Sequence, residues 1–324
     1  MNSIGVVIIG RNEGDRLVSC LKSLIAQSNQ LIYVDSGSID DSVSMARTLG
    51  AEVVTLDMTI PFTAARARNK GFERMRELYP NIEYVQFIDG DCEISCDWLE
   101  KAANYLALYQ VVAVVCGRRR ERYPERSVYN RLCDIEWDTP VGETKACGGD
   151  AMMRVSAFEN VHGFNPSLIA GEESELCVRL RAAGWQVWRL DAEMTLHDAA
   201  MTRFVQWWKR TLRSGYAYAE GVYLHGAPPE RHRVRESLSI WIWGLGIPMV
   251  AGSLGIWYGT WSLLVLLIYP VQIIRLTLRG TLSVKENWRR ASFLVLGKFP
   301  EAMGQVIFVY NRLRGKTARL IEYK

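Results

Sequence analysis

Between Gly5 and Gly117 the chain alternates short runs of β-branched residues with longer segments of helical periodicity. This rhythm predicts strands and helices in strict alternation, at 6–9, 15–26, 31–34, 40–49, 53–56, 64–78 and 83–88. Strand–helix–strand units fold into a mainly parallel sheet with helices packed on it. The chain is therefore predicted to contain an α/β domain. Runs at 111–115 and 185–190 add strands, and 118–145 is predicted to form loops and short elements over the site.

A second region is free of charge. From Ser237 to Ile274 the chain has 38 consecutive residues without a charged side chain, close to the ~40 residues that two membrane-spanning helices need. The run divides at the sequence Gly-Ile-Trp-Tyr-Gly-Thr, which predicts helices near 238–256 and 260–278. We expect a membrane hairpin over 231–280, with a re-entrant or interfacial helical hairpin as the alternative.

Basic residues flank this run on both sides: Arg231, Arg233 and Arg235 precede it, and Arg275, Arg279, Lys285, Arg289 and Arg290 follow it. By the positive-inside rule both flanks are expected on the cytoplasmic side, so that only the hairpin tip crosses. Beyond the run, 281–324 is predicted to form an amphipathic helix, on the membrane surface or on the soluble domain, and a basic tail.

Charge and cysteine usage exclude several classes. The net charge of +4, from 39 basic and 35 acidic residues without a basic stripe, gives no reason to expect a nucleic-acid partner. The seven cysteines form no C-x-x-C motif and no zinc-finger spacing. They are expected to be small buried hydrophobes in a reducing compartment. Charged residues within the first 20 positions argue against a secretory signal peptide, so the soluble part is expected in the cytoplasm.

Two carboxylates follow the predicted strand 83–88. Asp89 and Asp91 are separated only by Gly90, which permits a tight turn. The carboxyl ends of strands are where open α/β sheets bind ligands, and such a pair can hold a hard divalent cation. A solvated Asp-Gly-Asp turn is the alternative interpretation of the same residues.

Three further loops are expected at the same sheet edge. The residues after the first strand, Gly10-Arg11-Asn12-Glu13, lie where a nucleotide would bind, although they form no G-x-G-x-x-G motif. Asp35 ends the second strand and can accept hydrogen bonds from a base or a ribose, with helix capping by 35–42 as the alternative. Arg66 and Arg68, near a helix start, can grip a diphosphate or form a solvated basic face.

The order of these motifs resembles that of family 2 glycosyltransferases. The resemblance covers roughly residues 1–225 and rests on Val6-Val7-Ile8-Ile9, Arg11-Asn12-Glu13, Asp35-Ser36-Gly37-Ser38, Arg68-Asn69-x-Gly71, Asp89-Gly90-Asp91, Gly163-Phe164-Asn165 and Gly171-Glu172-Glu173-Ser174-Glu175. It implies a GT-A fold, Rossmann-like with a mainly parallel mixed sheet. It also implies a nucleoside-diphosphate sugar donor, a Mg²⁺ or Mn²⁺ cofactor and inversion at the transferred sugar.

The resemblance assigns donor-side roles residue by residue. Gly10, Arg11, Asn12, Glu13 and Asp35 would surround the nucleoside, although the family often has two adjacent aspartates where this chain has Asp35-Ser36. Arg66 and Arg68 would lie near the base or the diphosphate. Asp89 would face the ribose, and Asp91 would bind the metal directly. His197 resembles the histidine that completes the metal site in many such enzymes; a structural histidine is the alternative.

On the acceptor side, the family's Glu-Asp motif falls on Glu172-Glu173. Glu173 is assigned as catalytic base, with Glu172 as the fallback; an acidic first helical turn with a Glu175–Arg179 pair is the structural alternative. Gly148 and Gly149 match the acceptor-side loop. Trp207 lies in a sequence that partly resembles the Gln-x-x-Arg-Trp signature of processive synthases, and is predicted to stack on a sugar, to lie at the membrane interface or simply to pack.

The leading hypothesis is an inverting glycosyltransferase that moves one sugar to a lipid-linked or cell-envelope glycan at the cytoplasmic face of the inner membrane. Its catalytic domain is predicted to cover 1–230. A processive synthase is disfavoured, because the Arg-Trp order and the many membrane helices of such enzymes are missing from the sequence. Three alternatives stay open: a polyprenyl-phosphate glycosyltransferase, a sugar-1-phosphate nucleotidyltransferase and a non-catalytic membrane scaffold.

Overall fold

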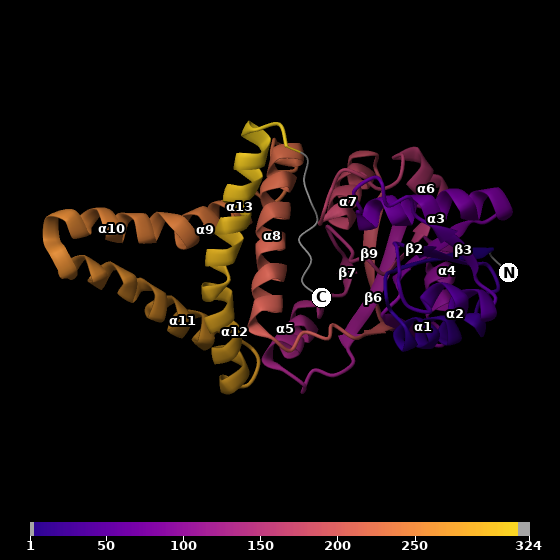
Figure 1. Cartoon of the computed structure of the whole chain (residues 1–324), viewed down its shortest axis with the longest axis horizontal. Helices are drawn as coiled ribbons and strands as arrows, with labels where there is room; N and C mark the ends of the chain where they lie inside the picture. Colours follow the sequence, from indigo (N-terminus) through magenta and orange to yellow (C-terminus); the bar gives the residue numbers. More distant parts are fainter. Residues whose placement is uncertain (1–2, 317–324) are drawn as a thin grey trace. The chain divides into compact units, whose positions relative to one another are not determined.

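The computed structural model describes residues 3–316, so the end of the predicted basic tail, 317–324, lies outside the described residues. The chain divides into two compact units after Ala200. The first is the α/β unit and the second is entirely helical where it is described (Figure 1). By this division the long helix α8 (Phe204–His225) is grouped with the helical unit, whereas the sequence placed the end of the catalytic domain near residue 230.

The first unit contains every strand and helix that was predicted up to residue 89, each within a few residues of its expected bounds. Its elements are β1 (Ile4–Gly10), α1 (Asp15–Ile25), β2 (Leu31–Asp35), α2 (Ser42–Thr48), β3 (Glu52–Thr55), α3 (Ala64–Leu78), β4 (Tyr84–Asp89), β5 (Cys92–Ile94), α4 (Trp98–Leu108), β6 (Val112–Glu121), α5 (Val128–Glu136), β7 (Gly142–Glu143), β8 (Ala151–Arg154), α6 (Val155–Asn160), α7 (Glu172–Ala182) and β9 (Gln186–His197).

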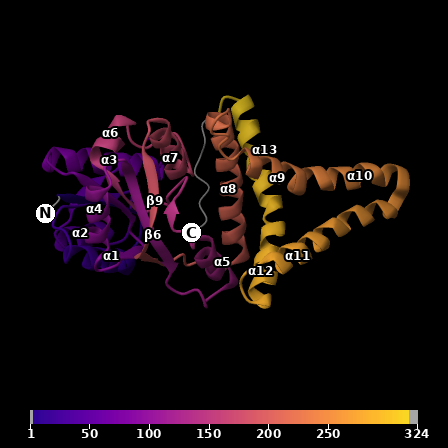
Figure 2. The same ribbon diagram turned by 180° about the vertical axis from the view of Figure 1, so that it is seen from behind.

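These strands form one mixed sheet in the order β3-β2-β1-β4-β8-β6-β9-β5, with β7 paired to β9. The half from β3 to β4 is parallel, and β8 runs antiparallel between β4 and β6. Helices α3, α6 and α7 cover one face of the sheet and α1, α2 and α4 cover the other (Figures 1 and 2). Because Ile9 is in register with Asp89 and Gly10 with Asp35, the loops after β1, β2 and β4 open at one sheet edge.

The segment 118–145 contains the predicted loops and short elements, except at its start, which belongs to a long strand. Strand β6 continues to Glu121, and residues 128–136 form α5, whose N-cap Ser127 accepts a hydrogen bond from Asn130 N at 3.0 Å. Charged residues usually lie at the protein surface, but here Arg118 is buried in an ion pair with Asp134, at 2.9 Å. A buried partner makes a charge compatible with a strand interior.

The second unit contains the predicted hairpin. After α8, helical structure runs from Val234 to Arg279 through α9 (Val234–Ile240), a π-helical segment (Trp241–Gly246), α10 (Ile247–Tyr258), a 3₁₀ segment (Gly259–Leu267) and α11 (Ile268–Arg279). The chain reverses at Gly259, whose φ of 57° favours glycine. In Figure 1 the two arms meet only at this tip and separate toward the rest of the unit.

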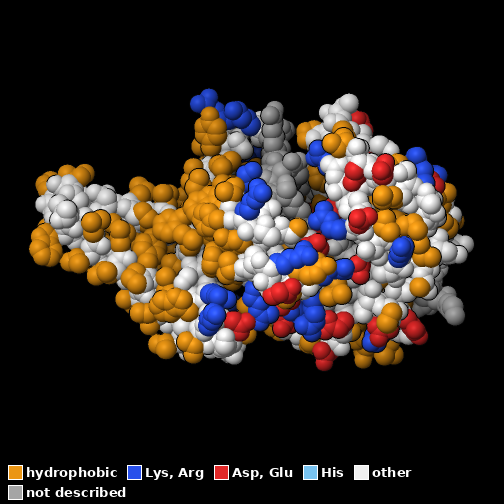
Figure 3. Space-filling model, turned by 60° about the horizontal axis from the view of Figure 1, so that its bottom comes forward, with side chains coloured by type: hydrophobic (Ala, Val, Ile, Leu, Met, Phe, Trp, Pro, Cys, Tyr) orange, Lys and Arg blue, Asp and Glu red, His pale blue; other side chains and the backbone are white. Residues whose placement is uncertain are grey.

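The hairpin surface is apolar and uncovered. Val234–Arg279 qualifies as a candidate membrane span, with a mean hydropathy of 1.7 over a window of which 11% is buried. In the face shown in Figure 3, this arm carries hydrophobic side chains and no charged ones. A soluble core helix would be mostly buried, so the exposure supports membrane insertion.

Two further helices complete the unit, α12 (Val284–Leu296) and α13 (Lys298–Leu313), and together they form a second candidate span of mean hydropathy 1.3. Helix α13 lies against α8 (Figures 1 and 2). The two approach closely at glycines: a Cβ on Gly304 would lie 2.1 Å from Leu212 O, and one on Gly215 would lie 2.0 Å from Glu301 O. The predicted amphipathic helix is thus a helix pair with one side packed within its own unit.

Candidate active site

The loops after β1 and β2 are joined by hydrogen bonds. Asn12 Oδ1 accepts from Ile39 N at 2.8 Å, and Ser42 Oγ accepts from Glu13 N at 3.2 Å. Arg11, which immediately precedes Asn12, is exposed. The two loops that were predicted to surround a nucleoside are therefore hydrogen-bonded to each other beside the sheet edge.

The carboxylate of Asp35 holds the loop after β2 in its conformation. It is buried, and its Oδ2 accepts from Gly37 N and Ser38 N, at 3.0 Å each. Tyr33 Oη donates to its Oδ1 at 3.3 Å. Gly10 passes close to the same tyrosine, since a Cβ there would lie 3.2 Å from its ring. Asp35 thus holds its own loop, and a contact with a nucleoside stays a prediction.

Asp89 lies between two arginines. Arg68 Nη2 is 2.9 Å from its Oδ1, and Arg119 Nη2 is 3.2 Å from its Oδ2. Burial opposes ionisation of Asp89, but the two guanidinium groups outweigh it and hold the pKa of this carboxyl below its ordinary value. Asp89 is therefore an anion with a fixed orientation at the end of β4.

Arg68 also reaches the first turn of α7. Its Nη1 lies 2.8 Å from Glu172 Oε1 and 3.5 Å from Glu173 Oε1. Its side chain is 3% exposed, so its charge is used within the protein, on three carboxylates. Binding of a diphosphate by Arg68 stays a prediction; in the structure Arg68 is a buried cation that joins the donor-side Asp89 to the two glutamates of α7.

Hydrogen bonds between the N-terminal part of α3 and the loop before α7, together called the clasp, hold Arg68 in this position. The neighbouring Asn69 donates from Nδ2 to Phe164 O at 2.7 Å and accepts at Oδ1 from Phe164 N at 2.9 Å. Thr63, the N-cap of α3, donates to Pro166 O at 2.9 Å. Two motifs about 95 residues apart along the chain are thereby held side by side.

Glu173 differs from Glu172 in its surroundings. Glu172 is buried and fully engaged by Arg68, whereas the side chain of Glu173 is 19% exposed and its contact to Arg68 is long. Burial raises the pKa of Glu173 to about 7, and the adjacent Glu172 carboxylate adds to this shift while Arg68 opposes it. A carboxylate with a pKa near neutrality, open to one side, suits a general base. The helix also contains the predicted Glu175–Arg179 pair, at 2.7 Å.

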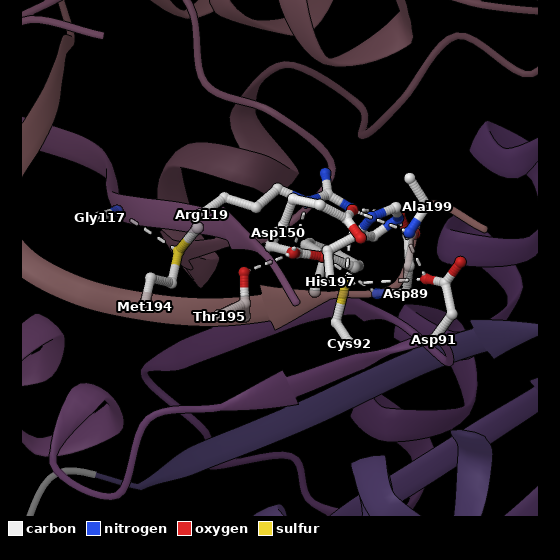
Figure 4. A network of polar contacts seen from close by, with 12 residues as sticks. Asp89, Asp91, Cys92, Gly117, Arg119, Asp150, Met194, Thr195, His197 and Ala199 are labelled. Atoms are coloured by element: carbon white, nitrogen blue, oxygen red, sulfur yellow. Dashed lines mark hydrogen bonds and ion pairs between the residues drawn. The ribbon is translucent and has the colours of Figure 1, made fainter. Parts of the chain in front are cut away.

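The two predicted metal ligands meet. His197 Nε2 lies 3.4 Å from Asp91 Oδ1, and ligand atoms of Asp91, Cys92 and His197 all lie within 4.8 Å of one another (Figure 4). Carboxylate and imidazole are donors that Mn²⁺ accepts, whereas a thiolate prefers softer metals. The residues present therefore fit a divalent cation held by Asp91 and His197, with further positions for water or substrate oxygens.

Sequence reasoning missed three residues that organise this site. Arg119 reaches Asp89 from β6 and lies 4.9 Å over the ring of Trp137. Asp150, with no exposed surface, accepts from Asp89 N at 3.1 Å and from Thr195 Oγ1 at 2.8 Å (Figure 4). No motif pointed to these residues.

The third missed residue is Glu121, also on β6. It is buried and its Oε2 lies 3.8 Å from His197 Nδ1, on the side of the ring away from Asp91. The same oxygen accepts from Ala199 N at 3.0 Å. A carboxylate behind a ligating histidine fixes the ring orientation. The one available signal was its two-residue offset from Arg119, which places both side chains on one face of the strand.

The remaining predicted residues lie in three different settings. Arg66 donates to the carbonyls of Ile60 and Pro61, at 2.7 and 2.8 Å, and so holds that loop. Gly149 is buried where a Cβ would lie 2.5 Å from Arg68 Nη2 and 3.1 Å from Glu173 Oε1, while Gly148 is exposed. The loop of these glycines therefore passes directly against the candidate base.

Trp207 belongs to the second unit. Its ring is 6% exposed and packs edge-on against Phe293 at 4.9 Å between ring centroids. This is the packing role among the three that the sequence allowed. Stacking on a sugar stays a prediction.

Comparison with known families gives two matches. Residues 5–161 match the model described as glycosyl transferase family 2, and residues 133–203 match one described as the N-terminal domain of galactosyltransferase. Together the matched ranges cover the strands and loops of the candidate site.

Curated relatives agree with the first of these models. The succinoglycan biosynthesis protein ExoA of Rhizobium meliloti is 25% identical over 57% of this chain and 60% of its own length. The glycosyltransferase AglE of Haloferax volcanii is 23% identical over 57% of this chain and 63% of its own length. The chain thus spans less than two thirds of these relatives.

Solved structures share the fold. The mannosyltransferase PcManGT from Pyrobaculum calidifontis, in complex with GDP-Man and Mn²⁺, superposes with a TM-score of 0.61 at 16% identity, covering 94% of this chain and 86% of that one. S. aureus TarS 1–349 gives 0.52 at 13% identity, over 97% and 92% of the two chains. These are glycosyltransferases of the GT-A fold, which confirms the fold class predicted from the sequence.

Proposed function

The chain belongs to family 2 of the glycosyltransferases, and on that premise we propose that it transfers one sugar, with inversion, from a nucleoside-diphosphate sugar to a lipid-linked or cell-envelope glycan. One observation carries the proposal. At a single sheet edge the structure gathers an oriented Asp89, the Asp91–His197 pair and, across Arg68, the carboxylate of Glu173. This is the set of groups that a direct displacement at a sugar carbon requires.

In the proposed reaction Glu173 accepts the proton of the acceptor hydroxyl while the hydroxyl oxygen attacks the anomeric carbon. The bond from that carbon to the diphosphate oxygen breaks on the opposite face, which inverts the anomer. A divalent cation, when bound by Asp91 and His197, neutralises charge on the departing diphosphate. Arg68 keeps Asp89 ionised and pairs closely with Glu172, which leaves Glu173 as the carboxylate that takes up a proton near neutral pH.

The acceptor and its location are inferred from the second unit. An exposed apolar hairpin flanked by arginines and lysines fits a chain held at the cytoplasmic face of a membrane, where lipid-linked glycans are accessible. The relative ExoA, named for succinoglycan biosynthesis, supports a cell-envelope acceptor. The hairpin would then keep the catalytic unit close to a substrate that lies in the bilayer.

A donor screen tests the proposal. The full chain in nanodiscs is supplied with UDP-, GDP- and dTDP-sugars, with and without Mn²⁺, and the released nucleotide is measured. We expect nucleoside diphosphate from one donor class, dependent on Mn²⁺, and a loss of at least about 100-fold in Asp91→Asn. Asp97→Asn, an exposed carboxylate of the same unit, is the matched control. Release of pyrophosphate would indicate a nucleotidyltransferase, and no turnover or donor binding in calorimetry would indicate a scaffold.

A further inference from the structure

Two cysteines are in contact behind the candidate base. Cys147 Sγ lies 3.6 Å from Cys177 Sγ, although the two residues are 30 positions apart in the chain. Cys177 is buried and Cys147 is partly exposed. A disulfide has its sulfur atoms about 2.05 Å apart, so the pair must close by only about 1.5 Å to form one. Neither residue has a role in the transfer reaction proposed above.

Each cysteine belongs to a segment that carries a site residue. Cys147 immediately precedes Gly148 and Gly149, and Gly149 passes against Arg68 and Glu173. Cys177 follows Glu173 by four residues on α7, which places both on one face of the helix. The sulfur pair therefore lies where the acceptor-side loop meets the helix of the candidate base.

The loop is held at both ends. Upstream, Thr144 N donates to Val187 O at 2.9 Å, next to β7. Downstream, β8 begins at Ala151 and is paired with β4 and β6. Between these anchors, Arg181 of α7 donates to Lys145 O. A covalent link at Cys147 would fix the middle of a segment whose ends are already fixed.

We propose that Cys147 and Cys177 form a reversible disulfide that fastens the loop of Gly148 and Gly149 to α7 and slows sugar transfer. The disulfide itself is inferred from the distance between the two sulfur atoms and does not depend on the proposed function. Its effect on the rate rests on the proposed function, because an acceptor must enter between this loop and Glu173.

The oxidant class is a hydroperoxide, represented by hydrogen peroxide. The hydrogen bond between the two thiols lowers the pKa of Cys177 and raises that of Cys147. The Cys177 thiolate therefore attacks one peroxide oxygen, so the O–O bond breaks and a sulfenic acid and hydroxide result. Cys147 then displaces the sulfenic oxygen from the Cys177 sulfur, which forms the S–S bond and releases a second hydroxide. The two protons of the thiols convert both hydroxides to water. Two thiols are oxidised, one peroxide is reduced to two waters, and a dithiol reductant reverses the change.

Other thiols of the first unit serve as internal references. Cys116 is buried on β6, and burial raises the pKa of its thiol to about 12, which makes it a poor nucleophile. Cys96 is exposed, so it reports on ordinary surface oxidation. A specific disulfide must form while Cys116 stays a thiol and before Cys96 is lost.

The test uses the full chain in nanodiscs, treated with hydrogen peroxide, quenched, alkylated and digested for mass spectrometry. We expect a cross-linked peptide joining Cys147 to Cys177 and at least a tenfold fall in kcat, both reversed by dithiothreitol. Cys147→Ser should keep at least half of the untreated rate and lose the peroxide sensitivity. Cys96→Ser, the matched control, should keep that sensitivity. If Cys147→Ser fails to fold, Cys177→Ala tests the same point.

The outcomes separate the two halves of the proposal. Absence of the Cys147–Cys177 peptide, or its appearance only after Cys96 is fully oxidised, overturns the disulfide. A disulfide that forms in an active enzyme without changing kcat overturns the control of the rate. A chain without transferase activity contradicts the proposed function, while the mass spectrum still decides whether the disulfide exists.

Discussion

The proposed base differs from its neighbour in its distance to Arg68 and in its exposure. Glu172 lies 2.8 Å from Arg68, whereas Glu173 lies 3.5 Å from it and is partly open. We expect Glu173→Gln to lower kcat by about 10²- to 10⁴-fold, because the amide cannot accept the acceptor's proton. The measurement is single-turnover transfer, with Glu77→Gln, an exposed glutamate of α3, as the control. A near-normal rate would favour a phosphate acceptor, which needs no base.

The same carboxyl predicts a pH dependence. Burial raises the pKa of Glu173 from 4.5 to about 7, and only the ionised form acts as a base. We therefore expect kcat/KM to rise with pH and to level off above about 7, and this limb to be absent in Glu173→Gln. For folding the sign is opposite: the stabilising contribution of this carboxyl is present below its unfolded pKa and is lost as the pH rises through about 7. An activity profile flat from pH 5.5 to 8 would contradict the assignment.

Three carboxylates form ion pairs with the single positive charge of Arg68. Replacing it in Arg68→Met leaves Asp89, Glu172 and Glu173 together without their shared cation, which we expect to cost about 3–5 kcal/mol of unfolding free energy. Arg74→Met on the same helix removes exposed pairs to Glu52 and Glu77 and should lower the unfolding free energy far less. Thermal unfolding in detergent compares the two. Equal losses would argue against a central role for Arg68.

The residues that sequence reasoning found and missed differ in a physical way. Asp89 ends a strand, Asp91 lies in the turn after it and Glu173 lies in the first turn of a helix, positions at which a charged residue has a local signature. Arg119 and Asp150 have none, because their roles exist only once the sheet places β8 between β4 and β6. A tertiary contact between distant strands has no periodicity or spacing in the sequence.

At the level of elements, the strand and helix rhythm predicted β1 to β4 well, because buried parallel strands are continuous apolar runs. The same reasoning found the start of β6, at 111–115, but missed its last four residues, which are charged; one of them, Arg118, pairs with the buried Asp134. It also missed the short strands β5 and β8, which are too brief to show a period. The hairpin was predictable from the length of its uncharged run alone.

The close packing of α8 against α13 depends on glycines, which have no side chain. A Cβ on Gly304 would lie 2.1 Å from a backbone oxygen of α8, which cannot move aside. We expect Gly304→Val to push the helices apart and to lower stability by about 1–3 kcal/mol. Gly252→Val, in α10, is the control, since nothing lies within 4 Å of a Cβ there. The measurement is thermal unfolding with limited proteolysis of α13; identical profiles for the two variants would show that the close approach is not needed.

For the whole molecule, the aromatic side chains at the hairpin tip bear on whether it spans the bilayer. Trp257 and Trp261 are 82% and 75% exposed beside the turn, and such rings favour the membrane interface over its interior. A tip that carries them is expected at the far interface. We predict that Thr260→Cys is labelled by an impermeant maleimide on intact cells, while native Cys96 is labelled only after lysis. A tip that stays unlabelled until lysis would mean that the hairpin only enters the bilayer.

The clasp between α3 and the loop before α7 has a consequence for synthesis. Arg68 and Glu172 are 104 residues apart, so at about 5–20 residues per second Arg68 leaves the ribosome about 5–20 s before its partner. Contacts of such separation close late in folding. A nascent chain can complete the βαβ half of the sheet early, yet it has no assembled catalytic centre until α7 and His197 have emerged. The hairpin at 234–279 is synthesised after both, so the catalytic centre can be complete before the chain inserts into the membrane.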